Sequence, residues 1–70
     1  MKDKLQISLA AARVNAKMTQ EDVAKTMKIG KRTIINWEKG ETIPSFADLN
    51  MLSEIYGIPI DNISLPIKST

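Results

Sequence analysis

The segment TQEDVAKTMKIGKRTIINWEKG, residues 19–40, decides the fold of this chain of 70 residues. Thr19, followed three positions later by Asp22, is a helix-start pattern in which each side chain can bond the backbone of the other residue. The apolar residues that follow recur at helical spacing and predict a short helix over residues 20–27. Gly30 is either a turn residue or the N-cap of a second helix over residues 31–39, which ends where Gly40 can adopt a left-handed conformation. The segment therefore predicts two short helices joined by a tight turn.

The second of these helices has two different faces. At about 100° per residue, Ile34 and Trp37 lie on one side, where they can enter a core. The opposite side carries Lys31, Arg32, Ile35 and Asn36. Arginine and lysine match the acceptors of guanine, asparagine can bond adenine twice, and an aliphatic side chain can contact a thymine methyl group. Ile35 is either such a contact or an isolated surface isoleucine. A basic second helix after a tight turn is the arrangement of a helix-turn-helix, which places that helix in the major groove of DNA.

The positive charge of the chain is concentrated in the same region. The net charge is only +2, but residues 1–24 sum to +1, residues 25–39 to +4 and residues 40–70 to −3. Such a run is commonly a solvated helix face. On a helix with the polar face described above, it favours a nucleic-acid partner.

The flanking segments complete a helical bundle. Asp3 with Gln6 predicts the start of a first helix over residues 4–16, and Ser45 with Asp48 predicts a further helix that ends at Gly57. Proline at 59 and 66 confines any additional helix to about residues 60–63. Four or five short helices with brief connections predict an all-α fold around one core.

The composition excludes most catalytic and metal-binding chemistry. The chain has no cysteine and no histidine, and so lacks thiolate ligands, the commonest metal ligand and the commonest general base. It has no glycine-rich phosphate loop, so we expect neither an enzyme, nor a cofactor, nor a small-molecule ligand. The N-terminus lacks the apolar stretch of a signal peptide, and no run approaches the ~18 apolar residues of a membrane span. We therefore expect a cytoplasmic protein that does not contact membranes.

Residues 19–40 resemble the core motif of phage repressors and Cro-type regulators, the Xre-like helix-turn-helix family. The resemblance is carried by an ordered set of residues, Gln20, Ala24, Ile29, Ile34, Trp37, Glu38 and Gly40. PSFADLNMLSEIYGIPIDNI, residues 44–63, is similar to the family's fourth helix and the start of its fifth. The resemblance implies a compact four- to five-helix lambda-repressor-like domain over residues 1–63. We expect residues 64–70 to form an extended C-terminal arm, on the grounds given below. The resemblance also implies a phage or prophage regulator of transcription that binds double-stranded DNA in a sequence-specific manner.

The resemblance assigns roles to individual residues. It implies that Gln20 bonds a DNA phosphate and supports the recognition helix, and that Arg13 and Glu38 form an ion pair linking the first and third helices. Phosphate contacts position such a protein, and base contacts choose its site. The expected base-reading residues are Lys31, Arg32, Ile35 and Asn36. Ile35 is included because of its position on the helix face and not because of the resemblance. The expected phosphate contacts are Gln20, Lys28, Lys39 and Thr42.

Two positions depart from the family pattern. Lys28 stands where the family usually has a glycine in the turn. Either this lysine adopts a left-handed conformation, at a cost of roughly 1 kcal/mol, or the turn is built differently. Gly30 replaces the usual serine or threonine at the N-cap of the recognition helix, which forfeits a side-chain hydrogen bond.

After Gly57 the apolar residues form two groups, Ile58 with Ile60 and Ile63 with Leu65 and Ile67. Within each group they recur every second position, which predicts an extended chain. Pro66 restricts this segment to a sheet edge or a lone arm. Its apolar side chains can be covered by the core of the same domain or by a second subunit. We expect the second, because a two-fold dimer places two recognition helices about 34 Å apart on a palindromic operator. The candidate dimer residues are Ile58, Ile60, Ile63, Leu65 and Ile67.

A protein-interaction module, such as an antitoxin or an antirepressor target, is the alternative function. Salt dependence separates the two classes, because affinity for duplex DNA falls steeply with the logarithm of salt concentration. A domain that holds only a partner protein has no such slope.

Overall fold

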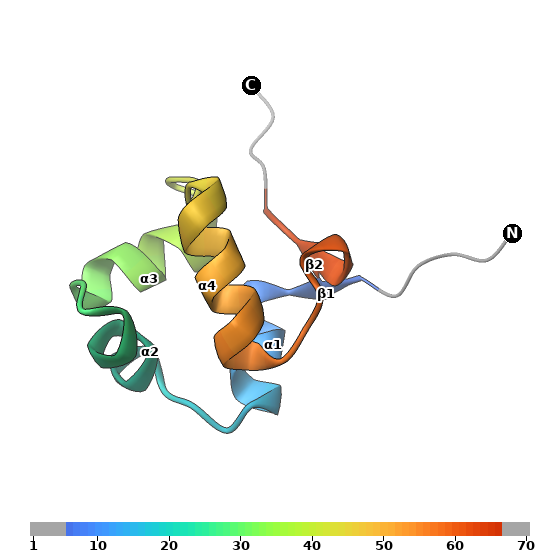
Figure 1. Cartoon of the computed structure of the whole chain (residues 1–70). Coiled ribbons are helices and arrows are strands. Elements are labelled where there is room, and N and C mark those ends of the chain that lie inside the picture. Colours follow the sequence, from blue (N-terminus) through green and yellow to red (C-terminus); the bar gives the residue numbers. More distant parts are fainter. Residues whose placement is uncertain (1–5, 67–70) are drawn as a thin grey trace, which may run out of the picture.

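A computed structural model describes residues 6–66 of the chain (Figure 1). The elements follow one another as β1 (Ile7–Ser8), α1 (Leu9–Asn15), α2 (Gln20–Met27), α3 (Lys31–Lys39), α4 (Phe46–Tyr56), a 3₁₀ turn η1 (Ile60–Asn62) and β2 (Ile63–Ser64). The helices surround a single core, and β1 and β2 lie side by side at one edge of the bundle. None of the helices among residues 6–66 has the length and apolar character needed to cross a membrane.

The helices α2, α3 and α4 begin where their capping residues predict. Thr19 and Asp22 form a reciprocal capping box, in which Thr19 Oγ1 accepts from the Asp22 amide at 3.0 Å and Asp22 Oδ2 accepts from the Thr19 amide at 2.8 Å. Ser45 Oγ accepts from the Asp48 amide at 3.1 Å. Gly30 is the N-cap of α3 and provides no side-chain bond. These local hydrogen bonds satisfy amides that the first turn of a helix leaves unpaired.

A residue with left-handed backbone lies one or two positions after the end of each described α-helix. The φ angle is +61° at Lys17 and at Lys28, +82° at Gly40 and +70° at Gly57. Beyond Lys28, the Ile29 amide donates to the Ala24 carbonyl at 3.0 Å, which is the Schellman arrangement of a helix end. Lys28 therefore adopts the left-handed conformation, the first of the two alternatives considered for the turn.

The first helix is shorter than expected from the sequence. Asp3, its expected N-cap, lies outside the described residues, and Gln6 is not helical. Ser8 is the actual N-cap, and its Oγ accepts from the Ala11 amide at 3.0 Å. Residues 7–8 form β1 instead, which pairs in parallel with β2, so that Ile7 lies opposite Ile63. The predicted helix from residue 4 is therefore wrong at residues 6–8, and the helical bundle contains a small β-ladder that an all-α fold does not have.

The core draws side chains from every helix and from β2. Its fully buried members include Leu9, Ile34 and Leu52. Ala24 of α2 is also buried, and α2 packs against α3. Among residues 6–66, the buried side chains that form this core are Leu9, Ala12, Val23, Ala24, Ile34, Trp37, Leu52, Tyr56 and Ile63.

The apolar residues after Gly57 turn inward. Ile63 is buried, and the half-buried Ile58 and Leu65 pack against the core. The core of the same domain thus covers Ile63 and part of Ile58 and Leu65, and the expected contact of these residues with a second subunit stays a prediction. Ile60 is half-buried on η1, and Ile67 lies outside the described residues.

The chain after β2 passes close to the end of α3. Gly40 is buried, and a Cβ atom placed on it would collide with the carbonyl oxygen of Pro66. Gly40 is therefore required both by its positive φ and by this close approach.

Candidate nucleic-acid interface

The helices α2 and α3 pack against each other and are joined by a tight turn. Val23 and Ala24 of α2 are buried together with Ile34 and Trp37 of α3. Within the turn, Ile29 packs against the core, while the flanking Lys28 and Gly30 are exposed. Only the face of α3 that carries Ile34 and Trp37 is therefore packed against the rest of the domain.

The other face of α3 is open and carries the expected base-reading residues. Arg32 and Lys39 are exposed, and their separation of seven positions puts them on the same side of the helix. Lys31 is exposed at the first turn, and Asn36 is half-buried beside this face. Ile35 is also half-buried, but it is not one of the side chains among residues 6–66 that pack against the core. The structure thus brings the four candidates to one side of α3, with an apolar side chain among polar ones.

The positive charge of this region points to solvent. Lys25, Lys28, Lys31, Arg32 and Lys39 are all exposed. Glu38, the acidic residue of the same stretch, forms an ion pair with Arg13 of α1. Because this pair neutralises Glu38, the exposed side of α2 and α3 keeps its excess of positive charge.

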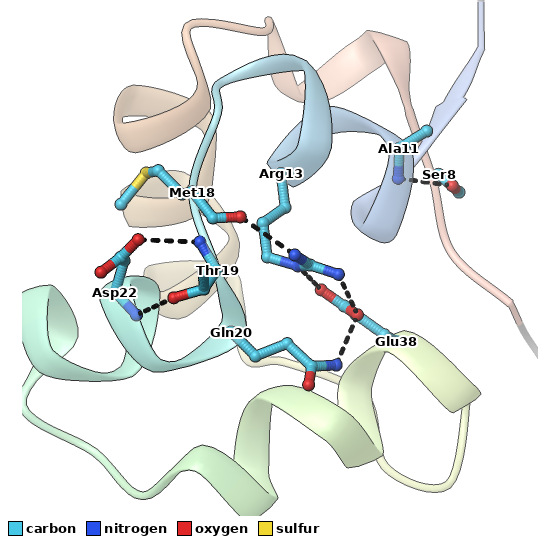
Figure 2. A network of polar contacts seen from close by, with 8 residues as sticks. All are labelled: Ser8, Ala11, Arg13, Met18, Thr19, Gln20, Asp22 and Glu38. Atoms are coloured by element: carbon cyan, nitrogen blue, oxygen red, sulfur yellow. Dashed lines mark hydrogen bonds and ion pairs between the residues drawn. The ribbon is translucent and has the colours of Figure 1, made fainter.

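Glu38 lies at the centre of a polar network that joins three helices (Figure 2). Arg13 Nε donates to Glu38 Oε2 at 2.7 Å, and Arg13 Nη2 donates to Oε1 at 3.3 Å. Gln20 Nε2 donates to the same Oε1 at 2.9 Å. Arg13 Nη1 also donates to the carbonyl oxygen of Met18 at 3.0 Å, which ties in the α1–α2 connection. The side chains of Arg13 and Glu38 are only 16% and 9% exposed, so this pair is largely shielded from water.

The charge of Glu38 contributes to the pKa shifts of two residues near it, Arg13 and Tyr56. The hydrogen bond from Arg13 to Glu38 raises the pKa of Arg13 above its ordinary value. Burial raises the pKa of the neighbouring Tyr56 to about 12, and the negative charge of Glu38 adds to this rise while Arg13 opposes it. Tyr56 therefore stays neutral, and Arg13 stays charged, throughout the physiological pH range.

Gln20 supports α3 through this network, since its amide reaches Glu38 from the start of α2. Sequence reasoning did not anticipate that both Gln20 and Arg13 bond to one carboxylate, nor that Tyr56 lies close by. These residues are far apart in the chain, so no local spacing indicates their contact.

The loop after α3 folds back on the end of the helix. The amides of Glu41 and Thr42 donate to the Asn36 carbonyl at 2.9 and 3.4 Å. Lys39 and Thr42 are exposed at this loop, next to the open face of α3. The described residues contain no pocket and no group of acidic residues that could hold a metal ion.

A family model described as helix-turn-helix matches residues 9–63. The chain belongs to this family, in the branch of repressor and Cro-type regulators. The match begins at α1 and ends at β2, so it covers all the helices of the helix-turn-helix domain described above. The family is non-enzymatic. Membership of it supports a role of this domain in DNA binding and in the regulation of transcription.

Two curated proteins illustrate what this helix-turn-helix domain is similar to. It is 38% identical over 48 residues to the cryptic phage CTXphi transcriptional repressor RstR of Vibrio cholerae, in a match that covers 69% of this chain and 43% of the repressor. It is 37% identical over 46 residues to an uncharacterized HTH-type transcriptional regulator of Methanocaldococcus jannaschii, covering 66% of this chain and 70% of that protein. The chain thus spans less than half of the Vibrio repressor's length. No solved structure gave a significant match.

Proposed function

We propose that this protein is a sequence-specific regulator of transcription that inserts α3 into the major groove of double-stranded DNA. The observation that carries the proposal is the division of α3 into two faces. Ile34 and Trp37 anchor the helix in the core, and the opposite side presents Arg32 and Lys39 to solvent. A helix held by one face and basic on the other fits a major groove lined by base acceptors and flanked by phosphates.

Within this proposal the side chains of α3 and its surroundings have two tasks. Lys31, Arg32 and Asn36 contact base edges, and Ile35 contacts a thymine methyl group, because these residues share the open face. The phosphate contacts come from the rim of that face, where Lys28 precedes α3 and Lys39 and Thr42 follow it. Gln20 bonds to Glu38 through one amide hydrogen, and its second hydrogen is assigned to a phosphate.

We also assign the protein to a phage or prophage repressor-like role, since one relative is named a cryptic phage transcriptional repressor. One recognition helix contacts few base pairs, so the protein acts as a homodimer on a palindromic operator. Its two copies of α3 then lie about one helical turn of DNA apart.

Selection of bound sequences from random duplexes tests this function, followed by affinity measurements on the selected site. We expect Arg32→Ala and Asn36→Ala each to weaken binding by ~1–3 kcal/mol and to relax base preference at one position. Lys39→Ala should weaken all sequences alike and reduce the salt dependence. Lys17→Ala is the matched control, because Lys17 is exposed but follows α1, outside the α2–α3 pair.

Two results contradict the proposal. An affinity for duplex DNA that does not fall with increasing salt concentration would indicate a module that binds only protein. A change of preferred sequence with Lys39→Ala but not with Arg32→Ala would show that the base-reading face is assigned wrongly.

A further inference from the structure

The polar network around Glu38 includes a residue that the proposed function places against DNA. Gln20 is the first residue of α2 and is half-buried. Its Nε2 atom donates to Glu38 Oε1 at 2.9 Å. One side of this amide is therefore held inside the protein, and the group that it offers to DNA depends on how it is held.

The carboxylate of Glu38 decides which end of the Gln20 amide faces it. A glutamine amide has a donor end and an acceptor end, and a freely rotating amide presents either. A carboxylate only accepts hydrogen bonds, so Glu38 requires the donor end of Gln20. Figure 2 shows this arrangement, with the nitrogen of Gln20 toward Glu38 and its oxygen turned away. The second hydrogen stays on the same nitrogen and suits a phosphate oxygen, which is also an acceptor.

Arg13 holds the carboxylate in one orientation. Arg13 Nε donates to Glu38 Oε2 at 2.7 Å, and Arg13 Nη2 donates to Oε1 at 3.3 Å, which makes a two-point contact. The guanidinium is itself held by the bond from Nη1 to the Met18 carbonyl oxygen at 3.0 Å. A two-point contact between arginine and a carboxylate fixes geometry in addition to its energy. Glu38 Oε1 is therefore fixed where the amide of Gln20 reaches it.

Arg13 also removes an electrostatic penalty. An unpaired carboxylate close to a DNA phosphate would repel it, since like charges brought together are unfavourable. The ion pair with Arg13 neutralises Glu38, so Glu38 can accept from Gln20 without opposing the phosphate. The pair is thus suited to orient a neighbouring donor within a basic surface.

We propose that Glu38, held by Arg13, is a positioning residue for DNA binding. It turns the amide of Gln20 so that an N–H group, and not the carbonyl oxygen, meets a DNA phosphate. This inference rests on the proposed function, in which Gln20 bonds a phosphate. It gives the Arg13–Glu38 pair a task in DNA binding that is separate from its contribution to stability.

The effect of this positioning is confined to one phosphate contact. A lysine ammonium carries three donors and no acceptor, so it cannot present a wrong end to a phosphate. The proposed contact from Lys39 therefore needs no such control. Loss of the Glu38 carboxylate should weaken the contact made by Gln20 and leave the contact made by Lys39 in place.

Glu38→Gln tests the proposal in the full-length protein, because it keeps the size of the side chain. Its amide both donates and accepts, so it no longer selects the donor end of Gln20. Charge alone would favour tighter binding, since the variant loses one negative charge near DNA. We expect instead that its affinity for the selected duplex is about 5- to 10-fold lower, the effect of losing a hydrogen bond to a charged group.

Glu21→Gln is the matched control. Glu21 is the exposed neighbour of Gln20 in the first turn of α2, and this substitution removes the same charge. Titrated at the same salt concentration, it should bind as tightly as the wild type or up to about 2-fold more tightly. A Glu38→Gln protein that binds as tightly as Glu21→Gln would overturn the proposal.

Neutral methylphosphonates, placed at one phosphate of the duplex at a time, locate the effect. In the wild type, one substitution should lower affinity by about 10-fold, and Gln20→Ala should remove this sensitivity. In Glu38→Gln the loss at that phosphate should fall below about 3-fold, while phosphates whose effect depends on Lys39 keep theirs. Partial unfolding of a variant lowers its affinity for all duplexes alike, so it does not change these ratios.

The ratios separate failure of this inference from failure of the proposed function. If Glu38→Gln keeps the full loss at the Gln20 phosphate, or if no phosphate depends on Gln20, the inference is wrong while binding through α3 stands. If the wild type binds no duplex in a salt-dependent manner, the proposed function fails and the inference fails with it.

Discussion

Replacing Glu38 with alanine removes the carboxylate on which α1, α2 and α3 converge. The change deletes two hydrogen bonds from Arg13 and one from Gln20. Arg13 then keeps its bond to the Met18 carbonyl but loses its counter-charge in a site where its side chain is only 16% exposed. The cost arises mainly from this stranded guanidinium, because a buried charge without a partner is strongly unfavourable.

The size of the expected loss in the free energy of unfolding follows from how far the Arg13–Glu38 ion pair is buried. Breaking a fully buried ion pair costs 3–5 kcal/mol, and breaking an exposed one costs under ~1 kcal/mol. With the carboxylate 9% exposed, Glu38→Ala lies near the lower end of the buried range, at about 3 kcal/mol. For a domain of this size, that loss lowers the melting temperature by about 12–24 °C.

Urea and thermal unfolding of Glu38→Ala, measured alongside Glu54→Ala, provide the assay. Glu54 is exposed on α4, so the control should lose under ~1 kcal/mol. A double-mutant cycle with Arg13→Ala isolates the coupling, which should exceed about 1.5 kcal/mol. If Glu38→Ala destabilises no more than Glu54→Ala, or if the cycle shows no coupling, the network does not stabilise the domain and the reasoning is refuted.

Three further predictions follow from backbone geometry and from burial. Lys28→Gly should relieve the strain of the left-handed backbone, raise the free energy of unfolding by about 1 kcal/mol and weaken DNA binding. Lys17→Gly should raise the free energy of unfolding by a similar amount and leave DNA binding unchanged. Chemical denaturation and DNA titration of the two variants check these expectations. Gly40→Ala should lower the free energy of unfolding by about 2–3 kcal/mol, because a Cβ at this position collides with the backbone. Gly57→Ala should lower it by only about 1 kcal/mol, because a Cβ there meets nothing within 4 Å. Equal losses of stability in urea unfolding would contradict this. Burial raises the pKa of Tyr56 to about 12 in the folded protein. The preference of the folded state for the neutral phenol therefore contributes fully to stability below pH 10, the pKa of an unfolded tyrosine. Up to ~2–3 kcal/mol of this stability is lost as the pH rises from 10 to 12. Unfolding measured across this window should show a smaller loss for Tyr56→Phe, and identical pH profiles would disprove the assignment.

The sequence predicts the central helices well because their boundaries depend on local chemistry. Thr19 and Ser45 cap α2 and α4 through bonds that span three residues, and Gly40 and Gly57 end α3 and α4. The faces of α3 follow from helical periodicity alone, so its open and buried sides agree with the expectation. These features need no knowledge of the tertiary structure.

The first helix and the C-terminal segment could not be predicted in this way. The spacing of apolar residues extends the helical pattern back past Leu9, but residues 7–8 pair with residues 63–64 at the other end of the described chain. The period of two after Gly57 correctly indicates extended backbone at Ile63, yet it does not reveal which surface covers that side chain. Both outcomes depend on a contact between distant segments, and periodicity contains no information about such a partner.

The parallel ladder between β1 and β2 has a consequence for the order in which the domain folds. It joins Ile7 to Ile63, which are 56 positions apart. Closing a loop of that length costs roughly 3.5 kcal/mol of chain entropy, and two residues of pairing on each strand return little of it. By contrast, the contacts of α2 with α3 form between neighbours in the chain and need no such closure. We therefore expect the α2–α3 pair to assemble while the ends are still apart. We expect the ladder to close last and to open first, and its closure to complete the contacts of α1 with both strands.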